Sequence, residues 1–590
     1  MEKLGVYFLV ITSMIIFTSC AAKKVQEKPE IERQAKAFID NYLKEYVPLH
    51  MDQLNYWFKS ATEGKEEYSK KYEEAELGLR LLNNNIENFL ALKNYYNNIS
   101  LIKDRAIKRN VEVLYFDHLV NQVPKDLLKK FTALEKKCIK TFNDYSPVLD
   151  GKKVTNSDLS KILSESMDSA ELENAWKASK IRGKDIEKDY IELIKIRNEI
   201  AKSLGYKNYA YLSADILGIS IKELDRFYED IYEATKEQFK YVKEEFIDVN
   251  LAKHYGITKS ELRPWHYKNP YFQAVPSSVF QGVDLDEYYK DKTSEDVIKL
   301  VVDFYASIGL DAEPSLERSS LYPAEGKSPH AAAWYLDPRK PSSVLYMNLP
   351  KAPKYPSAED ALTLVHELVH DFDYDASLAS DEVPLNMKEG KGQIAEAFAM
   401  LFEKQTVTKS WLKRIGATDE EIAKIQETSK LSDYIDQLVF LRWCSVMYYF
   451  ERLLYENPNQ NINNLWWQLK KKYQLLDKPK GWTNPDALAK YHTVTYNKVA
   501  LEYSEYALGY IINVSLGTAI ANKLGIDIKE NDYYGQKKLG PVLNKEFLTD
   551  ENLFPWKEYV EVKTGSKFSI KPWIEYYIKP EYHKQLPVIK

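Results

Sequence analysis

The stretch ALTLVHELVHD, residues 361–371, predicts both a helix and a metal centre. His366 and His370 are one helical turn apart within an apolar run, so both imidazoles project from the same side of the predicted helix. That spacing suits zinc, which binds histidine nitrogen at about 2.0–2.1 Å. Glu367 is placed to take a proton from a metal-bound water. Only nine histidines occur in the chain, which favours this interpretation over a helix with two surface histidines.

Length and composition limit the possible folds. The chain has 590 residues, of which 44% are hydrophobic and 13% aromatic, enough for one large two-lobed domain or two to four smaller ones. Its 21 glycines and 24 prolines are few for this length, which favours long helices and a mainly α fold. The net charge of −5, from 82 basic and 87 acidic residues, argues against a nucleic-acid partner.

The first twenty residues, MEKLGVYFLVITSMIIFTSC, have the form of an export signal. An apolar stretch over residues 4–17 precedes Cys20, and the ending FTSC resembles a bacterial lipoprotein signal, in which that cysteine is lipidated. We predict a signal peptide over residues 1–19, a flexible tether over 20–33 and one two-lobed domain over 34–590. The protein would then be exported to the cell envelope, facing the periplasm or on the outer surface, and meet the membrane only through its lipid anchor. An ordinary cleaved signal peptide is the alternative.

Amphipathic patterns predict a helical region between residues 31 and 260. Apolar residues recur at i, i+3, i+4 and i+7 in IERQAKAFIDNYLKEYVPL (31–49) and in KDIEKDYIELIKIRNEIAKSLG (184–205). Gly205 and Gly218 are typical helix stops. The sequence contains no C-x-x-C, so we expect Cys138 and Cys444 to be free thiols.

A short hairpin is predicted just before the metal helix. HAAAWYLD (330–337) and SSVLYMNL (342–349) have strand character and are joined by PRKP. An exposed strand edge beside a metal can hold an extended peptide by main-chain hydrogen bonds. A purely structural hairpin is the alternative.

Zinc requires a third protein ligand and a position open for water. Glu396 is the natural candidate, because it lies 26 residues beyond His370 on the next predicted helix, GQIAEAFAMLFEKQ. Glu389 and Glu403 are competing candidates, and each of the three could instead be a surface carboxylate.

The last informative stretch, residues 486–517, contains His492 and a row of tyrosines. Tyr503 and Tyr506 are three residues apart and share one helix face. Tyrosine at helical spacing is usually core, and with 44 tyrosines in the chain the row alone is weak support for a site. The row consists of Tyr496, Tyr503, Tyr506 and Tyr510.

Several segments in one order resemble the angiotensin-converting-enzyme family of zinc peptidyl-dipeptidases, a family of gluzincins. The likeness spans roughly residues 35–580. The matching segments are RNEIAKSLGYKN in the N-terminal half, HAAAW (330–334), HELVH (366–370), KEG (388–390) with IAEA (394–397), AKYH (489–492) with YSEY (503–506), and PWKEYVEVKTG (555–565). HELVH alone is shared by many zinc peptidases, whereas the ordered set is far more specific.

The resemblance implies a role for each matching residue. One zinc ion per chain would be bound by His366, His370 and Glu396. Glu367 would be the general base and then the acid, with His492 and Tyr506 stabilising the oxyanion. Substrate binding would fall to two groups of residues. These are Lys490 and Tyr503 for the C-terminal carboxylate of a peptide, and His330, Ala331 and Ala333 for its main chain.

The chain also departs from the family pattern. Glu505 replaces the arginine that the family uses for chloride binding, which argues against chloride activation. Met400 stands where the family has an aspartate that orients a zinc histidine, so another group must do this. The family glutamine that helps bind the carboxylate has no clear counterpart around RPWHYKNPYFQ, where Tyr267 falls nearest. The interval from His492 to Tyr503 is also about four residues longer than usual.

The resemblance therefore implies a mainly α, two-lobed zinc metallopeptidase with a deep central cleft and a small antiparallel sheet next to the metal helix. It would hydrolyse short peptides and release C-terminal dipeptides. The alternatives are an oligoendopeptidase of the thimet-oligopeptidase type and a catalytically inactive peptide-binding lipoprotein. The natural peptide, the side-chain preference and the oligomeric state stay open.

Overall fold

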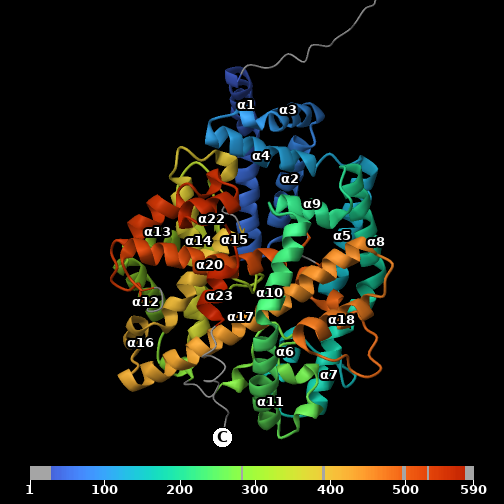
Figure 1. Cartoon of the computed structure of the whole chain (residues 1–590), viewed down its shortest axis with the longest axis vertical. Helices are drawn as coiled ribbons and strands as arrows, with labels where there is room; N and C mark the ends of the chain where they lie inside the picture. The colour runs from blue at the N-terminus through green and yellow to red at the C-terminus, as the bar shows by residue number, and fades with distance from the viewer. Residues whose placement is uncertain (1–27, 281–283, 389–391, 495–499, 528–530, 579–590) are drawn as a thin grey trace, which may run out of the picture.

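Helices dominate the computed structural model, which describes residues 28–280, 284–388, 392–494, 500–527 and 531–578 (Figure 1). Within these ranges the strands form two antiparallel pairs, β1 with β2 and β3 with β4. The second pair contacts the metal helix α14. The predicted mainly α fold with a small sheet beside that helix is therefore confirmed.

The elements before the metal helix are as follows. The helices are α1 (Lys28–Glu63), α2 (Glu66–Asn83), α3 (Ile86–Asn97), α4 (Arg105–Leu119), α5 (Lys125–Asp144), α6 (Asn156–Glu165), α7 (Ser169–Lys180), α8 (Arg182–Ser203), α9 (Tyr209–Ile216), α10 (Ile221–Tyr241), α11 (Asp248–Tyr255), α12 (Ser294–Ser307) and α13 (Glu313–Arg318). The strands are β1 (Val148–Leu149), β2 (Lys152–Lys153), β3 (Ala332–Tyr335) and β4 (Ser343–Tyr346).

From the metal helix onward, the helices are α14 (Ala358–Leu378), α15 (Gly392–Glu403), α16 (Lys409–Ile415), α17 (Asp419–Glu456), α18 (Ile462–Gln474), α19 (Tyr491–Val494), α20 (Tyr503–Leu524), α21 (Leu539–Leu543), α22 (Trp556–Thr564) and α23 (Lys571–Tyr577). Short segments are η1 (Ile99–Leu101), η2 (Val242–Ile247), η3 (Lys259–Glu261), η4 (Pro264–Tyr267), η5 (Ser277–Val279), η6 (Leu285–Tyr288), η7 (Leu385–Met387), η8 (Lys404–Val407), η9 (Asp486–Ala489), η10 (Asn544–Leu548) and η11 (Glu551–Leu553).

The first helix begins at Lys28, three residues before the predicted helical pattern that starts at Ile31 and within the predicted tether. Residues 28–33, expected in the tether, form the start of α1, where Ile31 and Ala35 are completely buried. These two residues are four apart, so one face of the first turns packs on a small N-terminal core with α3 and α4. That burial outweighs the charged composition from which a tether was predicted. The predicted signal peptide and Cys20 lie outside the described residues.

Two groups of helices are joined by the long helix α17. In Figure 1, helices α12 to α16, α20, α22 and α23 lie on one side of the molecule and α5 to α11 and α18 on the other. α17 contacts α16 and α20 in the first group and α8, α10 and α18 in the second. One continuous cluster of buried apolar residues runs through both groups. The predicted deep cleft between two lobes stays a prediction.

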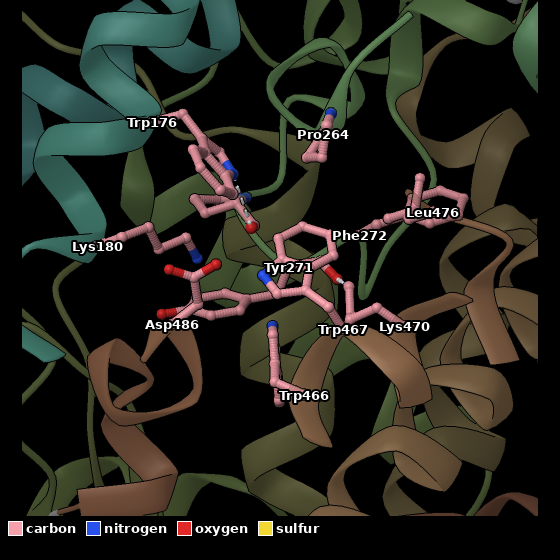
Figure 2. A pocket seen from close by; sticks show the side chains of 11 residues that line it. Trp176, Lys180, Pro264, Tyr271, Phe272, Trp466, Trp467, Lys470, Leu476 and Asp486 are labelled. Atoms are coloured by element: carbon pink, nitrogen blue, oxygen red, sulfur yellow. Dashed lines mark hydrogen bonds between the residues drawn. The ribbon is translucent and has the colours of Figure 1, made fainter. Parts of the chain in front are cut away.

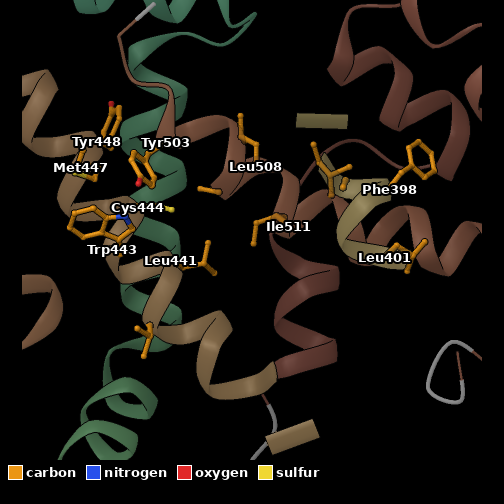
Figure 3. Packing of buried hydrophobic residues seen from close by; sticks show 14 of the residues in the cluster. Phe398, Leu401, Leu441, Trp443, Cys444, Met447, Tyr448, Tyr503, Leu508 and Ile511 are labelled. Carbon is orange, nitrogen blue, oxygen red and sulfur yellow. The ribbon is translucent and has the colours of Figure 1, made fainter. Parts of the chain in front are cut away.

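The core around α17 fixes the helices that carry the site. Trp443, Cys444 and Met447 of α17 pack toward Tyr503 of α20, and Phe398 of α15 lies beyond α20 (Figure 3). Ring centroids of Trp443 and Tyr503 are 5.6 Å apart at a nearly perpendicular angle, a favourable edge-to-face contact. Both described cysteines, Cys138 and Cys444, are buried free thiols, as predicted.

A glycine allows η9 to approach α8 closely. A Cβ atom added to Gly183 would collide with the carbonyl oxygen of Pro485, and would lie 3.4 Å from the backbone nitrogen of Ala489. Both contacts are with backbone, which cannot rotate away as a side chain does. Since Lys490 follows directly, this contact sets the position of a predicted substrate-binding residue.

We expect Gly183→Ala to lower the free energy of unfolding by about 1–3 kcal/mol, the usual cost of forcing an extra group into a packed interior. Thermal or urea unfolding measures the change. Lys184→Ala is the matched control, because Lys184 is the next residue of α8 and is exposed. Equal stability of the two variants would contradict the close packing of α8 on η9.

Candidate metal centre and active site

The helix α14 presents His366 and His370 as a pair. It begins with a capping box, in which the Ser357 hydroxyl accepts the Asp360 N–H and the Asp360 carboxylate accepts the Ser357 N–H. The Nε2 atoms of His366 and His370 lie 3.1 Å apart. Two nitrogens bound to one tetrahedral zinc are about 3.3 Å apart, given the usual bond length. The helix therefore holds the two imidazoles close to the spacing that zinc requires.

Glu396 approaches this pair from α15. Its Oε2 atom is 3.9 Å from Nε2 of His366, and the ligand atoms of the three residues all lie within 4.8 Å of one another. The position of α15 depends on Gly509 of α20, where an added Cβ would lie 3.0 Å from Cε of Met400 and 3.5 Å from Cβ of Glu396. The structure thus brings the three predicted ligands together through a tight helix contact.

Glu403, predicted as a competing ligand, lies behind His366. The Nδ1 atom of His366 donates to its Oε1 at 2.6 Å, so Glu403 orients the ring and leaves Nε2 directed toward Glu396. Such a carboxylate behind a metal-binding histidine fixes the ring and raises its basicity. It supplies an orienting group three residues after Met400, where the family has its aspartate. Glu389, the other competitor, lies outside the described residues.

The surroundings of the pair attract positive charge. Burial alone would lower the pKa of His366, but the hydrogen bond to Glu403 and the charges of Glu403 and Glu396 raise it to about 9. Burial and the charge on His366 lower the pKa of His370 to about 3. The pocket therefore favours one positive charge, carried by a proton on His366, and a divalent cation can take the place of that proton. The donor set and its charge fit zinc.

Glu367 is buried between α14 and the hairpin. Its carboxylate accepts a hydrogen bond from the backbone N–H of Ala333, and burial raises its pKa to about 7 although the charge on His366 opposes this. A carboxylate with a pKa near the working pH is suited to take up and return a proton.

The predicted hairpin is present beside this carboxylate. β3 and β4 pair in antiparallel register, with Ala333 opposite Leu345. Because the N–H of Ala333 points to Glu367, Ala331 and Ala333 share the edge of β3 that faces away from β4. His330 is exposed at the start of this edge, and its ring centroid is 6.2 Å from that of Tyr491. Glu367 uses the N–H of Ala333, and the remaining main-chain groups of this edge can bind the main chain of a peptide.

His492, Tyr503 and Tyr506 form one aromatic group. Ring centroids are 5.3 Å apart for His492 and Tyr503, 5.8 Å for the two tyrosines, and 6.5 Å for His492 and Tyr506. Burial lowers the pKa of His492 to about 4, so its imidazole is neutral. Tyr510 stacks on Phe440 in the core, and Tyr496 lies outside the described residues.

Lys490 lies next to this group and contacts a residue that sequence reasoning missed. Its Nζ atom donates to Oε1 of Gln273 at 2.8 Å and lies 6.0 Å from the ring centroid of Tyr503. Burial lowers the pKa of Lys490 to about 8. An ammonium, an amide and a phenol are thus gathered in one place, which suits a carboxylate.

Tyr267, which falls nearest to the family glutamine in the sequence, lies in a polar contact of its own. Tyr267 is buried, and its hydroxyl contacts Lys243 at 2.8 Å and Asp248 at 2.7 Å. Gln273, the last residue of RPWHYKNPYFQ, occupies the place beside Lys490 instead. The presence of a glutamine in that segment was the signal that could have identified it. Its position next to Lys490 could not be predicted, because the conformation of the preceding turn is not evident from the sequence.

Glu505 lies where the family has its chloride-binding arginine. It is close to the start of α15, because a Cβ added to Gly392 would lie 3.0 Å from its Oε2 atom. Burial, with the charges of Glu502 and Glu396, raises the pKa of Glu505 to about 8. The absence of chloride activation stays a prediction.

Across the described ranges, the structure contains no helix that is long and apolar enough to span a membrane. Export and lipidation of Cys20 stay predictions, because residues 1–27 lie outside those ranges.

The fold and the site together define a mainly α protein with a candidate metal centre, in which two histidines come from H-E-x-x-H and the third ligand comes from the following helix. A family profile described as angiotensin-converting enzyme matches residues 29–583. The chain belongs to this peptidase family.

A relative within this family is the angiotensin-converting enzyme of Sus scrofa, which is 21% identical over 528 residues. That alignment covers 81% of this chain and 39% of the porcine protein. The chain therefore corresponds to well under half the length of that relative.

We expect Glu403→Ala to weaken zinc binding about 10- to 100-fold, because His366 loses the group that orients its ring. Competition with a chromogenic chelator measures the dissociation constant. Glu403→Gln keeps an acceptor for Nδ1 and should lose less affinity. An unchanged zinc affinity in Glu403→Ala would show that the hydrogen bond does not support the metal centre.

Proposed function

We propose that this protein is a zinc-dependent peptidyl-dipeptidase, which hydrolyses short peptides two residues from a free C-terminus. The observation that carries the proposal is the meeting of His366, His370 and Glu396 beside the buried Glu367. Family membership supports zinc peptidase chemistry, and the contact of Lys490 with Gln273 supports recognition of a carboxylate.

Zinc, when bound by the two histidines and Glu396, lowers the pKa of a bound water to about 7 and polarises a carbonyl. Glu367 takes the proton from the attacking water. It later returns that proton to the amine that leaves, because general acid and base roles can alternate on one carboxylate. The N–H of Ala333 holds the carboxylate in place for both steps.

Tyr506 and His492 donate hydrogen bonds to the oxygen of the carbonyl under attack. The imidazole of His492 is neutral, so it donates without adding a full charge to the site. Donors of this kind contribute about 10²–10³ in turnover, since they strengthen as charge develops on the oxygen.

Lys490, Gln273 and Tyr503 bind the C-terminal carboxylate of the substrate. The edge of β3 with Ala331 and Ala333, and His330 at its start, hold the peptide main chain by hydrogen bonds. The C-terminus is held at one end and the scissile bond lies at the metal centre. The distance between these two points determines how many residues are released. This geometry is what would separate dipeptide release from internal cleavage.

We expect Glu367→Gln to retain one zinc per chain and to lose about 10²–10⁴ in kcat, because the amide cannot accept the proton. Zinc is measured by atomic absorption and hydrolysis with a fluorogenic peptide. His370→Ala is the control that should lose both zinc and activity. Normal turnover by Glu367→Gln would refute the base assignment. A zinc-loaded wild type without peptidase activity would instead favour the inactive peptide-binding alternative.

We expect a peptide with a free C-terminal carboxylate to be cleaved about 10- to 100-fold better, in kcat/KM, than the same peptide as its amide. The amide loses charge-assisted hydrogen bonds with Lys490 and Gln273. Mass spectrometry identifies the released fragment, and Lys490→Met should reduce the preference. Equal cleavage of the two peptides at internal bonds would favour the oligoendopeptidase alternative.

A further inference from the structure

The turn that presents Gln273 has an unusual backbone conformation. Phe272 has φ +52°, in the left-handed region that side chains other than glycine seldom adopt. The side-chain oxygen of Asn269 accepts the N–H groups of Tyr271 at 2.9 Å and of Gln273 at 3.4 Å. A turn of this kind persists only where surrounding contacts hold it.

Three buried side chains hold three consecutive carbonyl groups of this turn. Nε1 of Trp176 donates to the Pro270 oxygen at 3.2 Å. Nζ of Lys470 donates to the Tyr271 oxygen at 2.6 Å. Nε2 of Gln474 donates to the Phe272 oxygen at 2.5 Å. We call these three side chains, Trp176, Lys470 and Gln474, the carbonyl clamp.

The carbonyl clamp comes from two helices. Figure 2 shows Trp176 of α7 and Lys470 of α18 on either side of Tyr271. Lys470 and Gln474 are one helical turn apart, and Lys470 also donates to the side-chain oxygen of Gln474, so the two act together. Gln474 is completely buried. Both helices also contact η9, the segment directly before Lys490.

We propose that the carbonyl clamp positions Gln273 against Lys490 and thereby sets the affinity of the enzyme for the C-terminal carboxylate of its substrate. The next residue after the three held carbonyls is Gln273, whose Oε1 atom accepts from Lys490. Loss of the hydrogen bond to the Phe272 carbonyl lets the strained turn relax. The Gln273 side chain then moves out of hydrogen-bonding distance of Lys490. This inference rests on the proposed recognition of a carboxylate.

The test compares Gln474→Met with wild type, both loaded with zinc, on one peptide as free acid and as amide. Methionine keeps the volume of the side chain but cannot donate to the Phe272 carbonyl. We expect KM for the acid to rise about tenfold, while kcat, zinc content and the kinetics of the amide change less than twofold. Trp176→Phe, which removes the indole N–H together with part of the buried ring, should change KM for the acid in the same direction.

A matched control separates positioning from general stability. Asn198 is also a buried amide that bonds two backbone groups, the oxygen of Tyr455 at 2.8 Å and the N–H of Tyr209 at 3.0 Å, and it lies away from the turn. Asn198→Leu should lower the melting temperature and leave the ratio of acid to amide kinetics unchanged. In a Gln273→Ala background, Gln474→Met should have little further effect on KM, because both changes act through one side chain.

Two outcomes would overturn the inference and are distinguishable from failure of the proposed function. The first is an unchanged acid KM in both Gln474→Met and Trp176→Phe, with a wild type that still prefers the acid. The second is additivity of Gln474→Met and Gln273→Ala. A wild type that cleaves acid and amide equally would overturn carboxylate recognition itself, and the role of the clamp with it.

Discussion

The site depends on one close contact, the 3.1 Å between the Nε2 atoms of His366 and His370. The carboxylates of Glu367, Glu396 and Glu403 surround this pair. Holding the partly buried Glu396 near the buried Glu367 is unfavourable, and burial raises the pKa of each. A cation shared between His366 and His370 relieves that repulsion. Stability and function are therefore coupled here, since the groups that are costly to bury are the ones that bind the metal and move the proton.

Chemistry and recognition come from different kinds of structure. The metal ligands and Glu367 lie on α14 and α15, two regular helices packed against each other in the core. Lys490 and Gln273, by contrast, lie next to short segments and turns that far-separated helices hold in place. A regular helix gives the constant spacing that a metal requires. Turns allow a carboxylate site to be assembled from residues 217 positions apart.

Features that depend on local interactions could be predicted from the sequence, and features that depend on contacts between distant segments could not. The spacing of His366 and His370 is local, because helix geometry alone places both rings on one face. The place of Glu396 on the next predicted helix made it the preferred third ligand. The contact of Glu403 with His366 was not predicted, since it depends on how α15 packs on α14. Gln273 was out of reach, because its position depends on a left-handed residue and three carbonyl contacts that no periodic pattern encodes. The predicted tether (20–33) overlapped the amphipathic pattern that starts at Ile31, and the structure follows the helical pattern and extends it back to Lys28.

Two glycines show how the separate parts are kept at fixed distances. Gly509 lets α20 lie against the carbon chain of Glu396, and Gly183 lets α8 lie against the backbone before Lys490. In both places the missing side chain brings a predicted functional residue closer to its neighbours than any larger residue allows. The distance between metal and carboxylate site is thus set by backbone packing, not by the functional side chains themselves. Substitutions at these glycines would change that distance while leaving every functional group in the chain, which is why packing and specificity are inseparable in this fold.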